Sequence, residues 1–79
     1  MNSAIRVHAI RDPQARVWVA ESEDVPNLVA EAASVEALTE RLRGLIPELL
    51  EANGVVFPAD DEIPFDLIAE RHERVRMAS

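Results

Sequence analysis

The chain has 79 residues, 48% of them hydrophobic, which is enough for one domain with a single small core and leaves association as an expected source of stability. It has no cysteine, so disulfide bonds and thiolate metal sites are excluded. The formal net charge of −7 lies mostly in segment 12–66, which has thirteen acidic residues and three arginines. This charge disfavours binding to nucleic acid and favours binding to a basic partner.

Residues 4–22 are predicted to form a β-hairpin. Apolar strand-forming residues flank Asp12-Pro13-Gln14-Ala15, a sequence that suits a type I turn. We expect strands over about 4–11 and 16–22, with Ala9 opposite Trp18 across a two-residue loop, although a slip of one residue would exchange the faces. In the expected register one face carries Ile5, Val7, Ala9, Trp18 and Ala20, and the other carries His8, Ile10, Val17 and Val19.

A connector and a short third strand follow the hairpin. Pro26 lacks a backbone donor and Asn27 tolerates the left-handed conformation, so SEDVPN (22–27) is predicted to turn. The next six residues, LVAEAA (28–33), have the length of a short strand.

The following segment has the pattern of one amphipathic helix. Ser34 is predicted to cap its start and Asn53-Gly54 to end it. Pro47 removes one helical hydrogen bond, so we expect a bend there or a restart near Gly44. The apolar positions recur at helical spacing: Leu38, Leu42, Leu45 and Leu49.

The last element is ambiguous, because segment 65–72 alternates like a strand and also suits a helix. We predict a strand to about His72. The result is an α+β fold of two layers, in which a three-stranded antiparallel meander is followed by one long helix and a fourth strand. The helix covers one sheet face and leaves the other open, and an open apolar face of this kind predicts an interface, so we expect a homodimer.

No catalytic, metal or cofactor site is predicted. His8 and His72 could approach each other if the first and last strands are neighbours, but two histidines without a third ligand do not make a metal site. Asp12, Glu40 and Asp66 are interpreted as a turn residue, a helix-surface residue and an outward strand residue rather than as a nuclease trio. We therefore expect a protein that is not an enzyme.

Two sets of side chains are candidates for partner binding. An acidic surface would attract a basic protein, and apolar side chains would anchor it. Trp18 would join the anchor only in the slipped register. The acidic candidates are Glu21, Glu23, Asp24, Asp60, Asp61 and Glu62, and the apolar candidates are Ile10, Val17, Trp18, Val19 and Ile68.

The segment VWVAESEDVPNLVAEAASVEALTERLRGLIPELLEANG (17–54) resembles the HicB-like antitoxin superfamily, in particular its short stand-alone members. The shared features are an aromatic residue early in the second strand, Asp24-Val25-Pro26 where relatives carry Asp-Leu-Pro-Gly, the helix with Pro47-Glu48-Leu49-Leu50, and IPFDLIAERHERV (63–75) as a last strand. Asn27 stands where the family has Gly. This resemblance implies a partial RNase H-like fold without a nuclease site, and a small basic toxin that cleaves mRNA as the partner.

The chain is accordingly expected to be a single HicB-like domain over residues 1–79, without the C-terminal DNA-binding domain of longer antitoxins and without direct nucleic-acid binding. The N-terminus lacks a signal-peptide pattern and no stretch of about 18 apolar residues occurs, so a cytoplasmic location is expected. Two functions remain open: an antitoxin-like interaction module, and a self-associating structural protein without a toxin partner.

Overall fold

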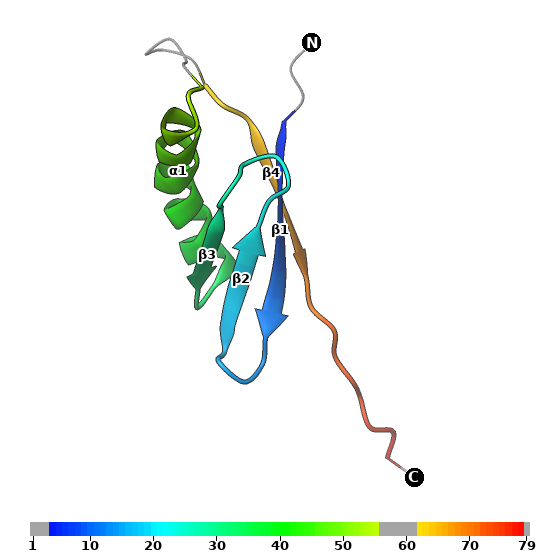
Figure 1. The fold of residues 1–79 in the computed structure, drawn as a ribbon. Coiled ribbons are helices and arrows are strands. Elements are labelled where there is room, and N and C mark those ends of the chain that lie inside the picture. Colours follow the sequence, from blue (N-terminus) through cyan, green and yellow to red (C-terminus); the bar gives the residue numbers. More distant parts are fainter. Residues whose placement is uncertain (1–3, 56–61, 79) are drawn as a thin grey trace.

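The computed structural model describes residues 4–55 and 62–78, which form a four-stranded sheet with one helix on one side (Figure 1). The sheet order is β3-β2-β1-β4, with β1 antiparallel to β2, β2 antiparallel to β3, and β4 parallel to β1. The predicted α+β fold, with its strand-strand-strand-helix-strand order, is confirmed. The elements are β1 (Ile5–Asp12), β2 (Val17–Glu21), β3 (Val29–Ala32), α1 (Val35–Ala52) and β4 (Phe65–Glu70).

The β1–β2 loop is longer than predicted, and it shifts the hairpin register. Arg16 adopts the left-handed conformation at φ 59°, and its amide donates to the Asp12 carbonyl at 2.8 Å, closing a four-residue loop. Ala9 therefore lies opposite Ala20, so the predicted pairing of Ala9 with Trp18 is wrong by two residues. A shift of two residues preserves both predicted faces, because side chains alternate with a period of two.

The Asp12 side chain stabilises the four-residue loop. Its Oδ1 accepts hydrogen bonds from the amides of Gln14 and Ala15, at 3.0 and 3.2 Å. The new register also places Arg11 opposite Trp18. The two-residue loop would instead have brought Arg11 close to Arg16, and like charges directly opposite each other are destabilising.

Helix α1 begins where the sequence predicts. The Ser34 side chain accepts a hydrogen bond from the Ala37 amide at 3.0 Å, as expected for an N-cap. The helix continues through Pro47 as one element, so it does not restart near Gly44. The bend at Pro47 stays a prediction.

The end of α1 is a Schellman motif built on Gly54, which has φ 81°. The Val55 amide donates to the Leu50 carbonyl at 2.9 Å, and the Gly54 amide donates to the Glu51 carbonyl at 3.0 Å. Asn53-Gly54 thus ends the helix as predicted.

The core lies between α1 and the covered face of the sheet. Small side chains on the strands let the helix approach closely, and the helix fills the space with large aliphatic side chains. Its buried line includes Ile46, whereas Leu45 and Leu49 are only partly buried. The buried residues are Val7, Ala9, Ala20, Val25, Leu28, Ala30, Leu38, Leu42, Ile46 and Leu50.

Strand β4 ends at Glu70, two residues before the predicted end at His72. Residues 71–78 are exposed and extend away from the body of the domain (Figure 1). They lengthen the molecule to 60 Å and contribute to a radius of gyration of 15.3 Å, against about 12 Å for a compact chain of this length. None of the helices within the described ranges could cross a bilayer.

Candidate functional site

The sheet face opposite α1 has an apolar centre that is open to solvent. Ile10 is 52% exposed and lies directly opposite Val19, which is half-buried. Ile68 on β4 is 41% exposed, and Val17 extends the centre toward the β1–β2 loop. The structure thus brings together four of the five apolar candidates, which we call the apolar centre: Ile10, Val17, Val19 and Ile68.

Trp18 belongs to the opposite face. It pairs with Arg11 on β1 and Ala32 on β3, and it packs against the core on the helix side. The slipped register, in which Trp18 would have joined the open face, is therefore wrong. Sheet pleating decides this, because Val17 and Val19 cannot point to the open face together with the residue between them.

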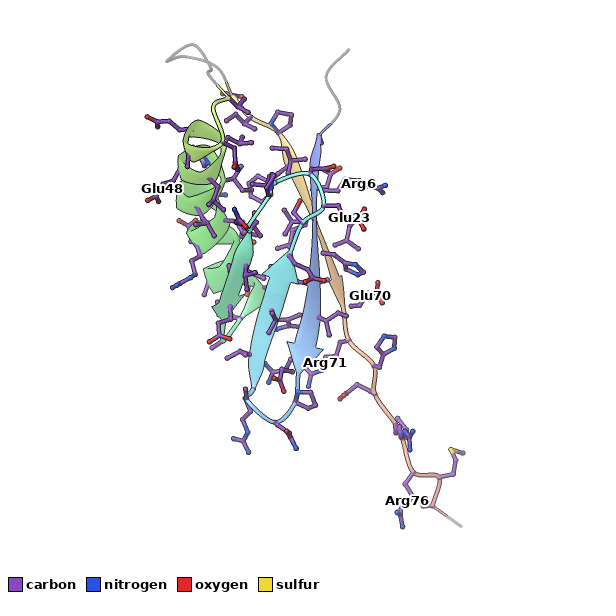
Figure 2. The ribbon with its side chains drawn as sticks, in the orientation of Figure 1. Arg6, Glu23, Glu48, Glu70, Arg71 and Arg76 are labelled. Carbon is purple, nitrogen blue, oxygen red and sulfur yellow. The ribbon has the colours of Figure 1, made fainter. Side chains whose placement is uncertain are left out.

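Carboxylates surround the apolar centre on the same face. Glu31 lies opposite Val19, and Glu70 lies opposite Ile10. Together with Glu21 and Asp66 they form a set that we call the acidic rim: Glu21, Glu31, Asp66 and Glu70. Arg6 is the one arginine among the described residues of this face, so the face is negatively charged (Figure 2).

Glu31, Asp66 and Glu70 were not predicted as binding residues. The sequence pattern does place them away from the core, since each alternates with core-facing residues in its strand. Placing them beside the apolar centre required the positions of β3 and β4 in the sheet, which strand periodicity alone does not provide. Glu21 was predicted, and its place at the end of β2 opposite His8 puts it in the rim.

The loop from 22 to 28 is fastened to β1 by two side chains. The Arg6 amide donates to Asp24 Oδ2 at 2.8 Å, and Ser22 Oγ donates to the Arg6 carbonyl at 2.6 Å. The Asp24 amide in turn donates to Ser22 Oγ at 3.1 Å. Arg6 has no partner on β2, and these bonds satisfy its backbone amide and carbonyl groups instead. Asp24, which was predicted as a binding residue, therefore holds the loop in place.

The same loop is anchored in the core. Val25 and Leu28 are buried, and the Leu28 amide donates to the Val25 carbonyl at 3.2 Å. Asn27 has φ 67°, so the predicted left-handed turn is confirmed. The loop is therefore held in place by the core and by β1, and Glu23 stays exposed on it.

The acidic candidates that the structure describes lie at one end of the sheet. Glu23 lies in the loop beside the start of β1, on the side away from α1 (Figure 2). Glu62 is exposed and precedes Pro64, whose carbonyl accepts from the Ile5 amide at 3.0 Å, so it lies at the same end. Asp60 and Asp61 lie outside the described residues.

A shallow groove connects this acidic end with the apolar centre. Its lining includes polar side chains of β1, β2 and the 22–28 loop together with apolar side chains of β3 and β4. Val29, 70% exposed, borders it on β3. The groove is open to solvent along its length, so it suits an extended protein surface better than an enclosed small molecule.

The two histidines meet at Glu70 rather than at each other. His8 Nε2 lies 2.5 Å from Glu70 Oε1, and His72 Nε2 lies 3.5 Å from Glu70 Oε2. All three side chains are substantially exposed. Across residues 4–55 and 62–78, no group of three or more histidine or carboxylate side chains is arranged to hold a metal ion.

The nuclease trio is not assembled as a site. Asp12 caps the β1–β2 loop, Glu40 pairs with Arg43 at 2.8 Å on the exposed side of α1, and Asp66 lies on the open sheet face. Glu40 and Asp66 are thus on opposite sides of the sheet, too far apart to share one substrate.

Comparisons with known proteins identify a relative of the same fold and a family. The chain is 43% identical to a hypothetical protein of the extremely thermophilic bacterium Thermus thermophilus, whose crystal structure is known. The match covers 95% of this chain and 100% of that one, with a TM-score of 0.69. No curated protein matches the chain. The HicB-like resemblance stays a prediction.

A family model described as a domain of unknown function, DUF1902, matches residues 4–79. This match spans nearly the whole chain and extends from β1 through the extended tail after β4. The chain therefore belongs to the DUF1902 family.

Proposed function

We propose that this protein is a non-enzymatic interaction module of the antitoxin type, which binds and neutralises a small basic RNA-cleaving toxin in the cytoplasm without a metal or cofactor. The observation that carries the proposal is the open sheet face, where the apolar centre is surrounded by the acidic rim. Exposed apolar side chains with a charged border are typical of protein-binding surfaces.

Charge complementarity determines the kind of partner. The acidic rim and Glu23 would attract the arginines and lysines that a ribonuclease uses to hold RNA. RNA and this protein would then compete for the same basic surface. Neutralisation follows from occupation of that surface, so it requires no chemistry from this chain.

Affinity and association rate are expected to depend on different residues. Charges at the edge of an interface mainly set how fast partners meet, whereas buried apolar anchors determine how long they stay together. Ile10 is the best anchor candidate, because it lies at the middle of the face and is 52% exposed in the free protein.

The alternative function is self-association without a toxin. It is supported by the small core and by the extended C-terminal segment, both of which favour contact with a second copy. In that case the acidic rim would keep the protein soluble rather than select a partner.

The test is to determine whether the adjacent reading frame encodes a small basic protein and to co-express it with this chain, followed by pull-down and an RNA-cleavage assay. The expected result is a stable complex in which RNA cleavage is suppressed. A neighbour that is toxic and unaffected by this chain, or the absence of such a neighbour, would contradict the toxin proposal and favour self-association.

Matched variants make the test specific for the open face. Glu31→Lys should slow association several-fold at low salt, whereas Glu48→Lys, the same charge change on α1, should have little effect (Figure 2). Ile10→Thr keeps a β-branched side chain and should weaken binding about tenfold through faster dissociation. Equal effects of Glu31→Lys and Glu48→Lys would show that binding uses another surface.

A further inference from the structure

The segment after β4 is extended and pairs with none of the described strands. Residues 71–78, which we call the tail, are all exposed and continue the direction of β4 away from the domain (Figure 1). Val75 and Met77 are 84% and 86% exposed. They fall on the same alternation as Leu67 and Ala69 of the covered face, while the arginines at 74 and 76 fall on the alternation of the open face.

The outer edge of β4 is free to accept another strand. Among the described strands, β4 pairs only with β1, so the backbone groups on its other side are unpaired. The covered side of this strand is also incompletely packed, since Leu67 is half-buried and Ala69 is exposed. An unprotected edge of this kind recruits strands from other chains.

We propose that a second copy of the chain occupies this edge, with β4 and its tail pairing antiparallel to the same segment of the other copy across a two-fold axis at His72. The tail of each copy thereby adds a strand to the β4 edge of the other. At about 3.3 Å per residue the eight-residue tail is about 26 Å long, and in this register its residues 74–78 lie beside 66–70 of the other copy.

Each face of the paired strands has complementary residues opposite each other in this register. On the open face, Arg74 lies opposite Glu70 of the second copy. On the covered face, Val75 lies opposite Ala69 and Met77 opposite Leu67, so the apolar tail residues complete the packing of β4.

Neighbouring registers are less favourable. With the axis at Arg71 two arginines would face each other, and with the axis at Glu73 two glutamates would do so. Axes between residues would exchange the faces, so that Val75 and Met77 would no longer lie beside Ala69 and Leu67. With the axis at His72, by contrast, Arg71 lies opposite Glu73 of the second copy.

The dimer has a defined consequence for the open face. Directly opposite residues in antiparallel strands share a face, so the two sheets join into one continuous sheet with both helices on the same side. The two apolar centres then lie on the other side and stay accessible. The pairing does not depend on a toxin partner, and its tests use the purified chain alone.

The first experiment measures the molar mass by light scattering across micromolar concentrations. The expected mass is twice the 8.8 kDa of one chain. Arg74→Glu places two carboxylates opposite each other at two symmetric positions, and it should raise the dimer dissociation constant at least tenfold. Arg41→Glu, the same charge change on the exposed side of α1, should leave it unchanged.

A chain that ends at His72 should be a folded monomer, because the deleted described residues are exposed and belong to no helix or strand of the domain. Circular dichroism establishes that it is folded. A monomeric full-length chain, or a dimer that survives this deletion, would overturn the proposal.

The second experiment tests the register by cross-linking, using the absence of native cysteine. His72→Cys should form a disulfide-linked dimer under mild oxidation, because residue 72 of each copy faces its own symmetry mate. Arg76→Cys should not, since residue 76 faces residue 68 and its symmetry mate lies about 26 Å away, far beyond disulfide reach. Equal cross-linking of the two variants, or none at His72→Cys, would overturn the register.

Discussion

Removing the Asp24 carboxylate should separate its structural role from a role in partner binding. In Asp24→Ala the Arg6 amide loses its acceptor, which lies 2.8 Å away. A hydrogen bond to a charged group contributes about 1.5–3 kcal/mol, and this one is exposed beyond the end of β2, so we expect a loss of about 1–2 kcal/mol of unfolding free energy. Asp24→Asn keeps an acceptor oxygen and should lose about half as much.

Urea unfolding followed by the fluorescence of the single tryptophan, Trp18, is a suitable assay. With a slope of about 1 kcal/mol per molar urea for a chain of this size, the midpoint of Asp24→Ala should fall by about 1–2 M. All variants are compared at one protein concentration, because association makes apparent stability concentration-dependent.

Glu23→Ala is the matched control. Glu23 is the exposed neighbour of Asp24 in the same loop, and its replacement should change stability by less than about 0.5 kcal/mol. Equal stability of Asp24→Ala and Glu23→Ala would refute the assignment of Asp24 as the residue that fastens the loop to β1.

The other predictions concern stability and use the same unfolding assay. Leu42→Ala should lower the unfolding free energy by about 2–5 kcal/mol, because Leu42 is fully buried. Leu45→Ala should lower it clearly less, because Leu45 is half-buried. Equal losses would mean that the helix face is misassigned. Gly44→Ala should stabilise the protein by about 0.5–1 kcal/mol, since an added Cβ meets no atom within 4 Å. Gly54→Ala should destabilise it by about 1 kcal/mol, because Gly54 has φ 81°. Changes of the same sign for both variants would contradict the helix-end geometry. Arg16→Gly should be neutral or stabilise the protein by up to about 1 kcal/mol, because Arg16 has φ 59°. Arg6→Gly within β1 should destabilise it. A clear loss of stability in Arg16→Gly would argue against the four-residue loop.

Local signals predicted β1, β2, β3 and α1, whereas β4 was predicted as a strand from the architecture, because segment 65–72 also suits a helix. Ser34, Asn53 and Gly54 set the limits of α1 through hydrogen bonds within a few residues, so their roles could be recognised without the rest of the molecule. The left-handed turn at Asn27 is local in the same sense. The alternation of β1 and β2 likewise predicted which residues share a face.

The candidate site was only half predictable. Ile10 and Val19 were identified because the hairpin alone places them on one face, and Glu21 was identified from the acidic run that begins there. Glu31 and Glu70 were missed, since they join that face only through the pairing of β3 with β2 and of β4 with β1. These pairings connect residues up to about 60 positions apart in the chain, where periodicity carries no information.

By itself the sequence determined the first three strands and the helix, the faces of the hairpin and the excess of acidic charge, because backbone propensity, capping and alternation act between close neighbours. Tertiary structure decided the hairpin register, the parallel position of β4 and the attachment of Asp24 to Arg6. The register depended on whether the loop after Asp12 took two or four residues, a small local difference settled by the pairing of the whole hairpin. Asp24 binds Arg6 because the pairing of β2 with β1 ends at His8, which leaves the backbone groups of Arg6 without a partner on β2. Only a residue brought close by folding could satisfy them.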